Sequence, residues 1–404
     1  MGVFRALGLM SGTSMDGIDA AIIETDGKYR IKQIATASLK YDTATQAMLK
    51  TAEYVMSESL GNSKIADADF QKLAKKFTKL HYPHLSELSE LWTMEKITRI
   101  SRELHEKLVK KILKKFNLPA DDIDLIGYHG QTLYHKPENK ITLQVGDGQK
   151  LADNTSIKVI NNFRMNDVMQ GGQGAPLAPI YHQALAVRDN IFPLLVINCG
   201  GIANITYITG KEHQDIIGFD TGPANILLDK LVRARTNNTE LYDKNAKYGK
   251  KGRVNDKVIT LLLQNSIIKN GKNYFETLPP KSLCSSDIVM IDEIEQLSLE
   301  DACANLANFT AFTIFDSVRK LNLGLPKKWL VVGGGAKNPL IIAQLAKYFG
   351  TKPVKIMWDK TYMEAELMAY MAVRSFIKLP LSFPSTTCVK VPCLGGDLYH
   401  PTNL

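Results

Sequence analysis

The chain has 404 residues and a formal net charge of +9, and its hydrophobic and charged contents of 45% and 23% are ordinary for a compact globular protein. These values argue against a disordered or fibrous protein, and the length predicts two domains rather than one. No apolar run approaches the roughly 20 residues that cross a bilayer, which predicts a cytoplasmic protein without a membrane partner.

The lysines and the cysteines argue against two further classes of protein. A predicted helix places Leu104, Leu108 and Ile112 on one face, and a solvated outer face accounts for its lysines. These are Lys107, Lys110, Lys111, Lys114 and Lys115. Because no aromatic residues or known motif accompany this charge, we expect no nucleic-acid partner. The 5 cysteines are scattered without a Cys-x-x-Cys motif, which indicates reduced thiols and no zinc site.

The N-terminal residues read as three short strands, Val3–Met10, Ile18–Glu24 and Ile31–Leu39. The turn between the first two, Ser11–Gly17, offers backbone N–H groups and hydroxyls to an oxyanion and could cradle a phosphate. It lacks the Gly-Lys-Ser/Thr ending of a Walker loop, so a plain serine-rich hairpin turn remains an equal alternative.

Residues 41–117 are predicted to be helical, and a strand then returns at 124–128. That strand leads into His129-Gly130-Gln131-Thr132, which we interpret as a polar turn at a strand end. A single histidine in such a place is more often structural than catalytic.

The stretch Asn162–Pro176 puts Arg164 and Asp167 just before Gly171, Gly172 and Gly174. A predicted strand leads in, and the glycines let the backbone turn tightly or approach a ligand. Because ligands bind beyond the carboxyl ends of strands in open sheets, Asp167 is the first candidate for chemistry. The alternative is a capped turn that holds a structural salt bridge.

The second half repeats the order of strand, small-residue turn and strand. Strand 193–197 leads into the turn Asn198–Asn204, and strand 329–332 leads into Gly333–Asn338 and a helix to Phe349. This duplication predicts two similar α/β domains, at 1–185 and 186–404, facing each other across a cleft that holds a phosphorylated ligand. The last helix is expected to pack back on the first domain.

Two acidic residues of the second half have ordinary alternatives to a binding role. Asp220 follows a predicted strand, and it could cap the next helix, with Pro223 in its first turn, or contact a substrate. Strand 354–358 precedes a helix at 363–378, where Glu364 could simply complement the helix dipole.

Five of these turns together resemble the anhydro-N-acetylmuramic acid kinase family, of the actin, Hsp70 and hexokinase superfamily. They are Gly8–Asp19, His129–Thr132, Phe163–Pro176, Asn198–Asn204 and Phe219–Pro223, and Gly333–Asn338 and Met363–Ala365 extend the likeness almost to the C-terminus. The resemblance implies an α/β fold of two duplicated ribonuclease-H-like domains with an interdomain nucleotide and sugar cleft. It also implies a cytoplasmic homodimer that acts in peptidoglycan recycling.

The resemblance implies an enzyme that uses ATP and water to open the 1,6-anhydro ring of its sugar and phosphorylate O6. Asp167 would be the general base, since a carboxylate is ionised at neutral pH and can take a proton from water. Substrate contacts would come from Arg164, Glu364, His129, Gln131 and Asp220. The nucleotide would be bound by Gly12, Thr13, Ser14, Met15, Asp16, Gly17, Ile18, Asp19, Gly200, Gly201, Asn204, Gly333, Gly334, Gly335 and Asn338. Mg²⁺ would be held mainly through the phosphates of ATP, because the sequence identifies no metal ligands.

The sequence departs from the family pattern at three places. Leu283-Cys284 follow Lys-Ser where Thr-Gly-Arg-Glu is common, Ala224 replaces a usual glycine, and Asn245-Ala246 stand where Asp-Gly is common. A missing Arg could weaken binding of an acidic sugar. Two other functions stay open: a levoglucosan kinase-like enzyme, and a non-catalytic nucleotide-binding switch.

Overall fold

The computed structural model describes residues 2–269, 271–356, 358 and 361–402, and the chain divides into two compact units. The first unit comprises Met1–Arg188, Thr361–Pro384 and Val389–Leu404, and the second comprises Asp189–Lys360 and Ser385–Cys388. This division differs from the expected ranges 1–185 and 186–404, because most of the C-terminal segment belongs to the first unit. The chain therefore enters the second unit twice.

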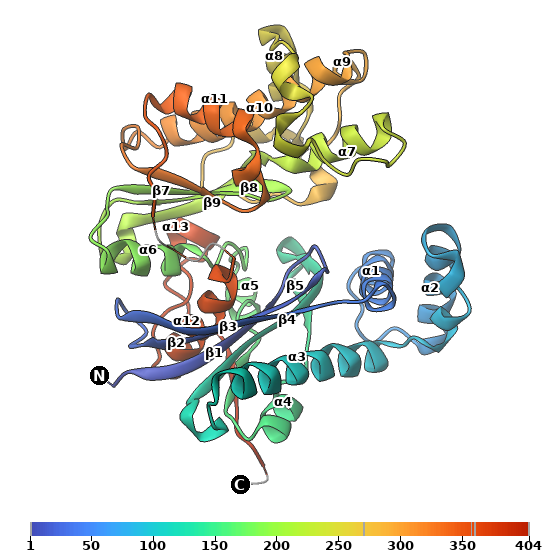
Figure 1. Ribbon diagram of the computed structural model, residues 1–404, viewed down its shortest axis with the longest axis vertical. Coiled ribbons are helices and arrows are strands. Elements are labelled where there is room, and N and C mark those ends of the chain that lie inside the picture. Colours follow the sequence, from blue (N-terminus) through green and yellow to red (C-terminus); the bar gives the residue numbers. More distant parts are fainter. Residues whose placement is uncertain (1, 270, 357, 359–360, 403–404) are drawn as a thin grey trace. The chain divides into compact units, whose positions relative to one another are not determined.

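The first unit is built on one sheet, in the order β13-β6-β4-β1-β2-β3, with β5 paired to β4 outside that order (Figure 1). Strands β1, β2 and β3 are antiparallel neighbours, whereas β4 runs parallel to β1, and β6 runs parallel to β4. The strands are β1 (Phe4–Ser11), β2 (Gly17–Thr25), β3 (Ile31–Lys40), β4 (Leu125–Lys136), β5 (Ile141–Val145), β6 (Val159–Asn161) and β13 (Asp397–Tyr399). The three predicted N-terminal strands are thus confirmed.

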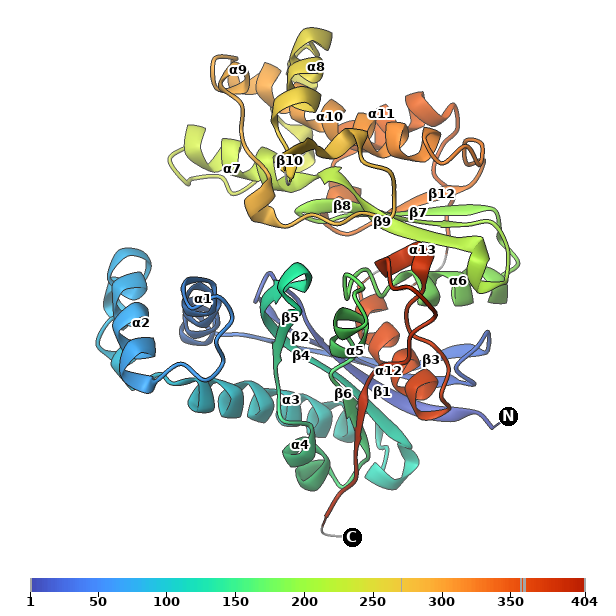
Figure 2. The same cartoon turned by 180° about the vertical axis from the view of Figure 1, so that it is seen from behind.

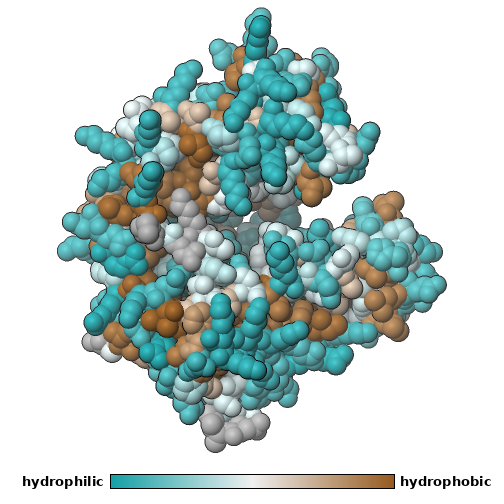
Figure 3. All heavy atoms as spheres, viewed as in Figure 1, coloured by the Kyte–Doolittle hydropathy of each residue, from teal (hydrophilic) through white to brown (hydrophobic). Residues whose placement is uncertain are grey.

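Helices cover both faces of this sheet, with α12 on the opposite side from α1 and α3 (Figure 2). The helices are α1 (Thr43–Glu58), α2 (Asp67–His81), α3 (Met94–Phe116), α4 (Gly148–Thr155), α5 (Met165–Met169), α6 (Pro179–Arg188) and α12 (Met363–Phe376). The helical prediction for 41–117 is confirmed by α1, α2 and α3. Hydrophilic side chains gather over α3 (Figure 3), and its five expected lysines are exposed.

Two glycines let α12 lie directly on the sheet. Gly8 in β1 and Gly127 in β4 are paired across the strands, and a Cβ at either would come within about 2 Å of a backbone oxygen of α12. At Gly8 that oxygen belongs to Ala365, and at Gly127 it belongs to Met368. This close approach fixes the position of the helix that begins beside Glu364.

The second unit contains a smaller sheet in the order β12-β7-β8-β9, and a separate hairpin of β10 and β11. Its strands are β7 (Leu194–Cys199), β8 (Ile202–Ile208), β9 (Ile216–Pro223), β10 (Ile268–Lys269), β11 (Lys272–Asn273) and β12 (Trp329–Val332). Its helices are α7 (Asn225–Arg235), α8 (Asp256–Asn265), α9 (Asp292–Glu295), α10 (Leu299–Arg319), α11 (Pro339–Phe349) and α13 (Pro384–Thr387), of which Pro384 lies in the first unit. The long helix α10 contacts β8, β9, α7 and α11 and carries much of the core.

The two sheets share one plan, which confirms the predicted duplication of a ribonuclease-H-like domain. In both, the first three strands form an antiparallel meander, and a later strand, β4 or β12, pairs in parallel with the first. The turn between the first two strands carries the small residues in each unit. None of the helices in the described part of the chain has the length and hydropathy needed to cross a membrane.

Two local predictions are wrong. His129–Thr132 is not a turn at a strand end, because β4 continues to Lys136 through an irregular step in its pairing with β1. Residues 354–356 and 358 are not in a strand, although the Val354 N–H donates one bond to the Trp329 carbonyl. Met357 lies outside the described residues.

Candidate active site

The candidate base Asp167 lies in the short helix α5, just beyond the carboxyl end of β6. Its side chain is buried, and both carboxylate oxygens accept hydrogen bonds. The Gly174 N–H donates to Oδ1 at 2.6 Å, and the Ser382 hydroxyl donates to Oδ2. These two bonds orient the carboxylate, and a carboxylate is a group that can accept a proton.

Two of the three glycines after α5 lie so close to other parts of the protein that a side chain would not fit. A Cβ at Gly172 would lie 2.2 Å from Asp167 Oδ1, and a Cβ at Gly174 would lie 2.7 Å from a methyl of Val168. Only at Gly171 is the space open, and there the backbone has a φ of +85°. The expected close approach to a ligand is therefore replaced, at Gly172, by a close approach to the candidate base.

Arg164 connects the glycine turn to the strand β4. Its Nε–H donates to His129 Nε2 at 3.1 Å, and Nη1 donates to the Gly174 carbonyl at 2.7 Å. Burial lowers the pKa of Arg164 to about 10, against the charges of Glu364 and Asp167, which both favour the guanidinium ion. Among the described residues Nη2 has no hydrogen-bond partner, so one edge of the guanidinium remains available to an anion.

His129 is a neutral and oriented side chain. Its Nδ1 lies 2.8 Å from the Gly130 carbonyl and donates to it, which leaves Nε2 to accept the bond from Arg164. Burial, and then the Arg164 charge, lower the pKa of His129 to about 3. His129 therefore holds Arg164, and both of its ring nitrogens are engaged within the protein.

Sequence reasoning missed His135, which holds the other side of the glycine turn. Its Nε2 donates to the Gln173 carbonyl at 3.0 Å, and its Nδ1 lies 2.9 Å from the Thr142 hydroxyl. Burial lowers the pKa of His135 to about 4. The sequence does contain a signal, because His135 is a second histidine a few residues after His129. That signal was missed, because a turn was expected at His129 and not a strand that continues to His135.

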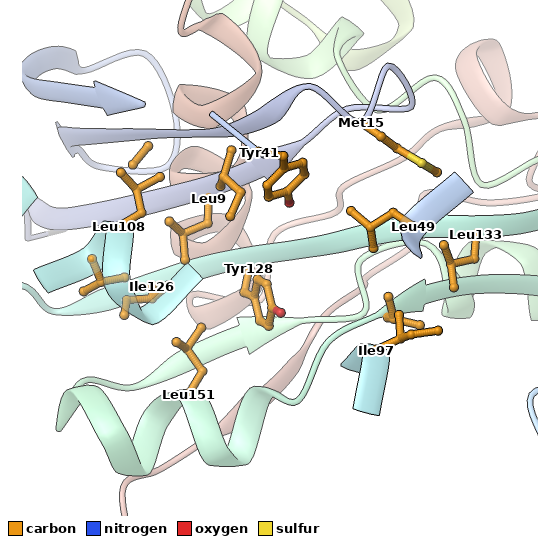
Figure 4. Close-up of a cluster of buried hydrophobic side chains, with 14 of the residues drawn as sticks. Leu9, Met15, Tyr41, Leu49, Ile97, Leu108, Ile126, Tyr128, Leu133 and Leu151 are labelled. Atoms are coloured by element: carbon orange, nitrogen blue, oxygen red, sulfur yellow. The ribbon is translucent and has the colours of Figure 1, made fainter. Parts of the chain in front are cut away.

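The first hairpin turn exposes some expected phosphate contacts and buries others. Thr13, Ser14 and Asp16 are exposed, and the Ser14 hydroxyl donates to Asp16 at 2.7 Å. Met15 has a φ of +54°, and its side chain is buried in the core (Figure 4). The side chain of Ile18 is buried as well. These two residues can offer only their backbone to a nucleotide.

Gln131 supports that hairpin turn. It is fully buried, and its Nε2 donates to the Gly12 carbonyl at 3.1 Å. Among the described residues its Oε1 has no hydrogen-bond partner. Gln131 therefore fixes the position of the turn through the backbone of Gly12.

In the second unit, the Gly200-Gly201 turn is tied to the start of α7. The N–H groups of Ala224 and Ile226 donate to the Gly201 carbonyl, and the Asn225 N–H donates to the Gly200 carbonyl. These three N–H groups are therefore engaged within the protein, and they hold the turn against the helix start. Asn204 lies farther along in β8, opposite Asp220 of β9.

Asp220 does not cap α7, because it lies inside β9, as does Pro223, and Ala224 occupies the N-cap position. Its Oδ2 accepts the Leu283 N–H at 2.8 Å. Burial raises the pKa of Asp220 to about 7, although this bond and the charge of Lys269 oppose the rise. A cation or a hydrogen-bond donor supplied by a ligand would stabilise the ionised form of a carboxylate in such an environment.

The turn Gly333–Asn338 borders a cavity of about 400 Å³ in the second unit. Two glycines of this turn lie close to the end of β7. A Cβ at Gly333 would lie 2.6 Å from Asn198 Oδ1, and a Cβ at Gly335 would lie 2.4 Å from the Cβ of Cys199. Asn338 caps α11, where its Oδ1 accepts the Leu340 and Ile341 N–H groups. The cavity is lined by Asn225, Leu228, Asp229, Tyr242, Asp243, Lys244, Asn245, Gly334, Lys337 and Asn338. Its size suits a nucleoside.

No three His, Cys, Asp or Glu side chains gather as a metal site in the residues that the structure describes. Mg²⁺ commonly takes one or two carboxylates together with substrate phosphates and water, so a dedicated cluster is not required.

Comparison with known proteins gives the family. The family model for anhydro-N-acetylmuramic acid kinase matches residues 71–401. A relative of that name from Zymomonas mobilis is 37% identical over 98% of this chain and 99% of its own, and one from Azorhizobium caulinodans is 37% identical over 98% and 100%. The chain belongs to the anhydro-N-acetylmuramic acid kinase family. The solved structure of a ROK hexokinase from Thermus thermophilus aligns with 92% of this chain and with 100% of its own chain. The TM-score is 0.40 and the sequence identity is 10%.

The departures from the family pattern of these kinases lie in the second unit. At Leu283 the backbone N–H, which does not depend on the side chain, holds Asp220. Asn245 and Ala246 both have a positive φ, of +56° and +54°, which asparagine tolerates and which suits the glycine common at the second position. The backbone conformation thus agrees with the family pattern even where the side chains differ.

The buried histidines make the stability of this kinase depend on pH. Burial lowers the pKa of His105 and His182 to about 4 and is the main reason for the lower pKa of His129. The unfolded chain binds protons below about pH 6.5 while the native state does not, so stability falls as pH falls from 7 to 5. We expect a loss of about 2 kcal/mol per histidine at pH 5. Urea unfolding at pH 7 and at pH 5 measures this loss. Equal free energies of unfolding at the two pH values would contradict the prediction.

Replacement of Asp220 by Asn is expected to stabilise the protein, and to lower turnover if Asp220 contacts the substrate as the family resemblance implies. The native pKa of about 7 exceeds the value of 3.8 for a free aspartate, so stability from this group is lost as pH rises between them. The amide keeps an acceptor for Leu283 and carries no charge, and we expect a gain of about 1 to 3 kcal/mol at pH 8. Urea unfolding and turnover of the variant test both parts. A variant that is less stable at pH 8 would show that the buried charge is compensated.

Proposed function

We propose that the protein is an ATP-dependent kinase that opens the 1,6-anhydro ring of 1,6-anhydro-N-acetylmuramic acid by hydrolysis and phosphorylates O6. The products are N-acetylmuramic acid 6-phosphate and ADP. The observation that carries the proposal is the oriented Asp167, which lies beside Arg164 in a chain of this family. Membership of the family and the names of the relatives support the substrate.

In the proposed reaction Asp167 takes a proton from the water that attacks the anomeric carbon. A carboxylate suits this role when it is ionised and oriented, and the bonds from Gly174 and Ser382 orient it. That attack breaks the bond between C1 and the bridging oxygen O6. This oxygen stays on C6 and then receives the phosphoryl group of ATP, which leaves as ADP. No covalent intermediate with the protein is needed.

Arg164 and Glu364 are proposed to bind the sugar. The free edge of Arg164 can pair with a carboxylate, and the lactyl group of the proposed sugar carries one. Glu364 starts α12, which Gly8 and Gly127 hold against the sheet, and its side chain is exposed at a helix end. Its carboxylate can accept hydrogen bonds from sugar hydroxyls.

For the nucleotide, we propose that the cavity beside Gly334 and Asn338 holds the nucleoside of ATP. The exposed Thr13 hydroxyl and the backbone N–H groups of Thr13, Ser14 and Asp16 suit phosphate oxygens. Mg²⁺ bound to those phosphates would neutralise charge during transfer, with water and at most a carboxylate completing its coordination.

Three rates of ADP release distinguish this proposal from its alternatives. We expect release with 1,6-anhydro-N-acetylmuramic acid, much slower release with levoglucosan, and almost none without a sugar. A levoglucosan kinase would reverse the first two rates, and a non-catalytic switch would show none. The names of the relatives favour neither alternative. The family resemblance also suggests a homodimer, which sedimentation velocity would test.

A further inference from the structure

The helix that carries Asp167 is too short to be stable by itself. Helix α5 spans Met165–Met169, little more than one turn, and isolated helices of this length are marginal in water. Its start at Arg164 has no side-chain cap. The geometry of the candidate base must therefore be set by the segments that contact α5.

One of these contacting segments comes from the far end of the chain. Ser382 and Cys393 form an isolated antiparallel bridge, in which the Cys393 N–H donates to the Ser382 carbonyl at 2.9 Å. Leu381, beside Ser382, is buried and donates its N–H to the Cys393 carbonyl at 2.8 Å. We refer to these two paired residues as the Ser382–Cys393 bridge.

The bridge contacts α5 on two consecutive residues. The Asn166 Nδ2 donates to the Leu394 carbonyl at 2.7 Å, directly after Cys393. The buried Ser382 hydroxyl donates to Asp167 Oδ2. Gly395 then approaches the residue before Arg164, since a Cβ there would lie 2.7 Å from the Phe163 carbonyl oxygen.

Two donors fix the carboxylate plane of Asp167. With the Gly174 N–H on Oδ1 and the Ser382 hydroxyl on Oδ2, rotation about the bond between Cβ and Cγ would break both. Bonds to an ionised carboxylate are stronger than neutral ones, so the restriction is substantial. Without Ser382, Oδ2 would lose this donor in a buried site.

We infer that Ser382 is a positioning residue for the reaction, and that its hydroxyl holds the Asp167 carboxylate in the orientation that accepts the proton. The inference rests on the proposed function for the role of Asp167. Ser382 itself is not placed against the substrate, and it acts only through the carboxylate that it holds.

Ser382→Ala should lower kcat by about tenfold to a hundredfold and leave the KM of the sugar and of ATP unchanged, because the base is misplaced while binding groups remain. In the Asp167→Asn background the same substitution should have no further effect, since no base remains to be positioned. Ser89→Ala is the matched control, because Ser89 is also fully buried in the first unit and donates a hydrogen bond, to Ser86. An unchanged kcat, or an equal fall in both backgrounds, would overturn the inference.

A crystal structure of Ser382→Ala tests the positioning without the reaction. We expect the Asp167 carboxylate to rotate or to occupy two orientations, with loss of the bond to Gly174. A carboxylate that keeps its single orientation would overturn the inference. Absence of anhydrosugar phosphorylation by the unmodified protein would instead refute the proposed function, so the two failures are distinguishable.

Discussion

Asp167→Asn is expected to lower kcat by about a hundredfold to ten-thousandfold, the range that a positioned general base supplies. The amide keeps the size of the side chain and can still accept one of the bonds from Gly174 and Ser382, but it cannot take a proton from water. The KM of the sugar should change little, because Arg164 and Glu364 remain. Steady-state ADP release at saturating sugar and ATP measures the effect.

The control for this substitution is Asp69→Asn, which removes an exposed carboxylate from α2 in the same unit. Its kcat should match that of the unmodified protein. If Asp167→Asn retained near-normal turnover with a normal thermal unfolding transition, Asp167 would not be the base.

Gly172→Ala is expected to lower kcat by about a hundredfold, although it adds only a methyl group. That methyl would lie 2.2 Å from Oδ1 and 2.6 Å from Cγ of Asp167, so the carboxylate must move. A displacement of about 1 Å at a reacting group can cost two orders of magnitude in rate. The backbone itself accepts alanine, because Gly172 does not have a positive φ.

Gly171→Ala provides the matched comparison one residue away. No heavy atom lies within 4 Å of the added Cβ, but the φ of +85° is strained for alanine. We expect a loss of about 1 kcal/mol of stability and an unchanged kcat. Equal turnover losses in the two variants would mean that the turn, and not the position of Asp167, limits the rate.

The sequence predicted the duplicated fold well because hydrophobic strands and small-residue turns recur in the same order in both halves. It also placed Asp167 at a strand end, and β6 and α5 confirm that location. Local composition suffices for such features, since a strand and the turn after it are encoded by adjacent residues.

What the sequence did not predict depends on contacts between distant residues. The polar run at His129 was interpreted as a turn, but pairing with β1 and β5 keeps it in a strand. A helix cap was one of two roles open to Asp220, yet β9 continues past it and its carboxylate is held by Leu283, 63 positions later. Ser382 lies 215 positions from Asp167, and no local pattern links the two.

The proposed hydrolytic opening of the ring can be tested in water enriched in ¹⁸O. We predict a product whose mass exceeds that of the anhydrosugar by one phosphoryl group and one labelled water. The label should lie on the sugar, and none should lie on the phosphate. Early time points, and the finished product incubated alone in the same water, control for exchange at the anomeric carbon. A phosphorylated product that lacks the added water, or a label found on the phosphate, would contradict the account.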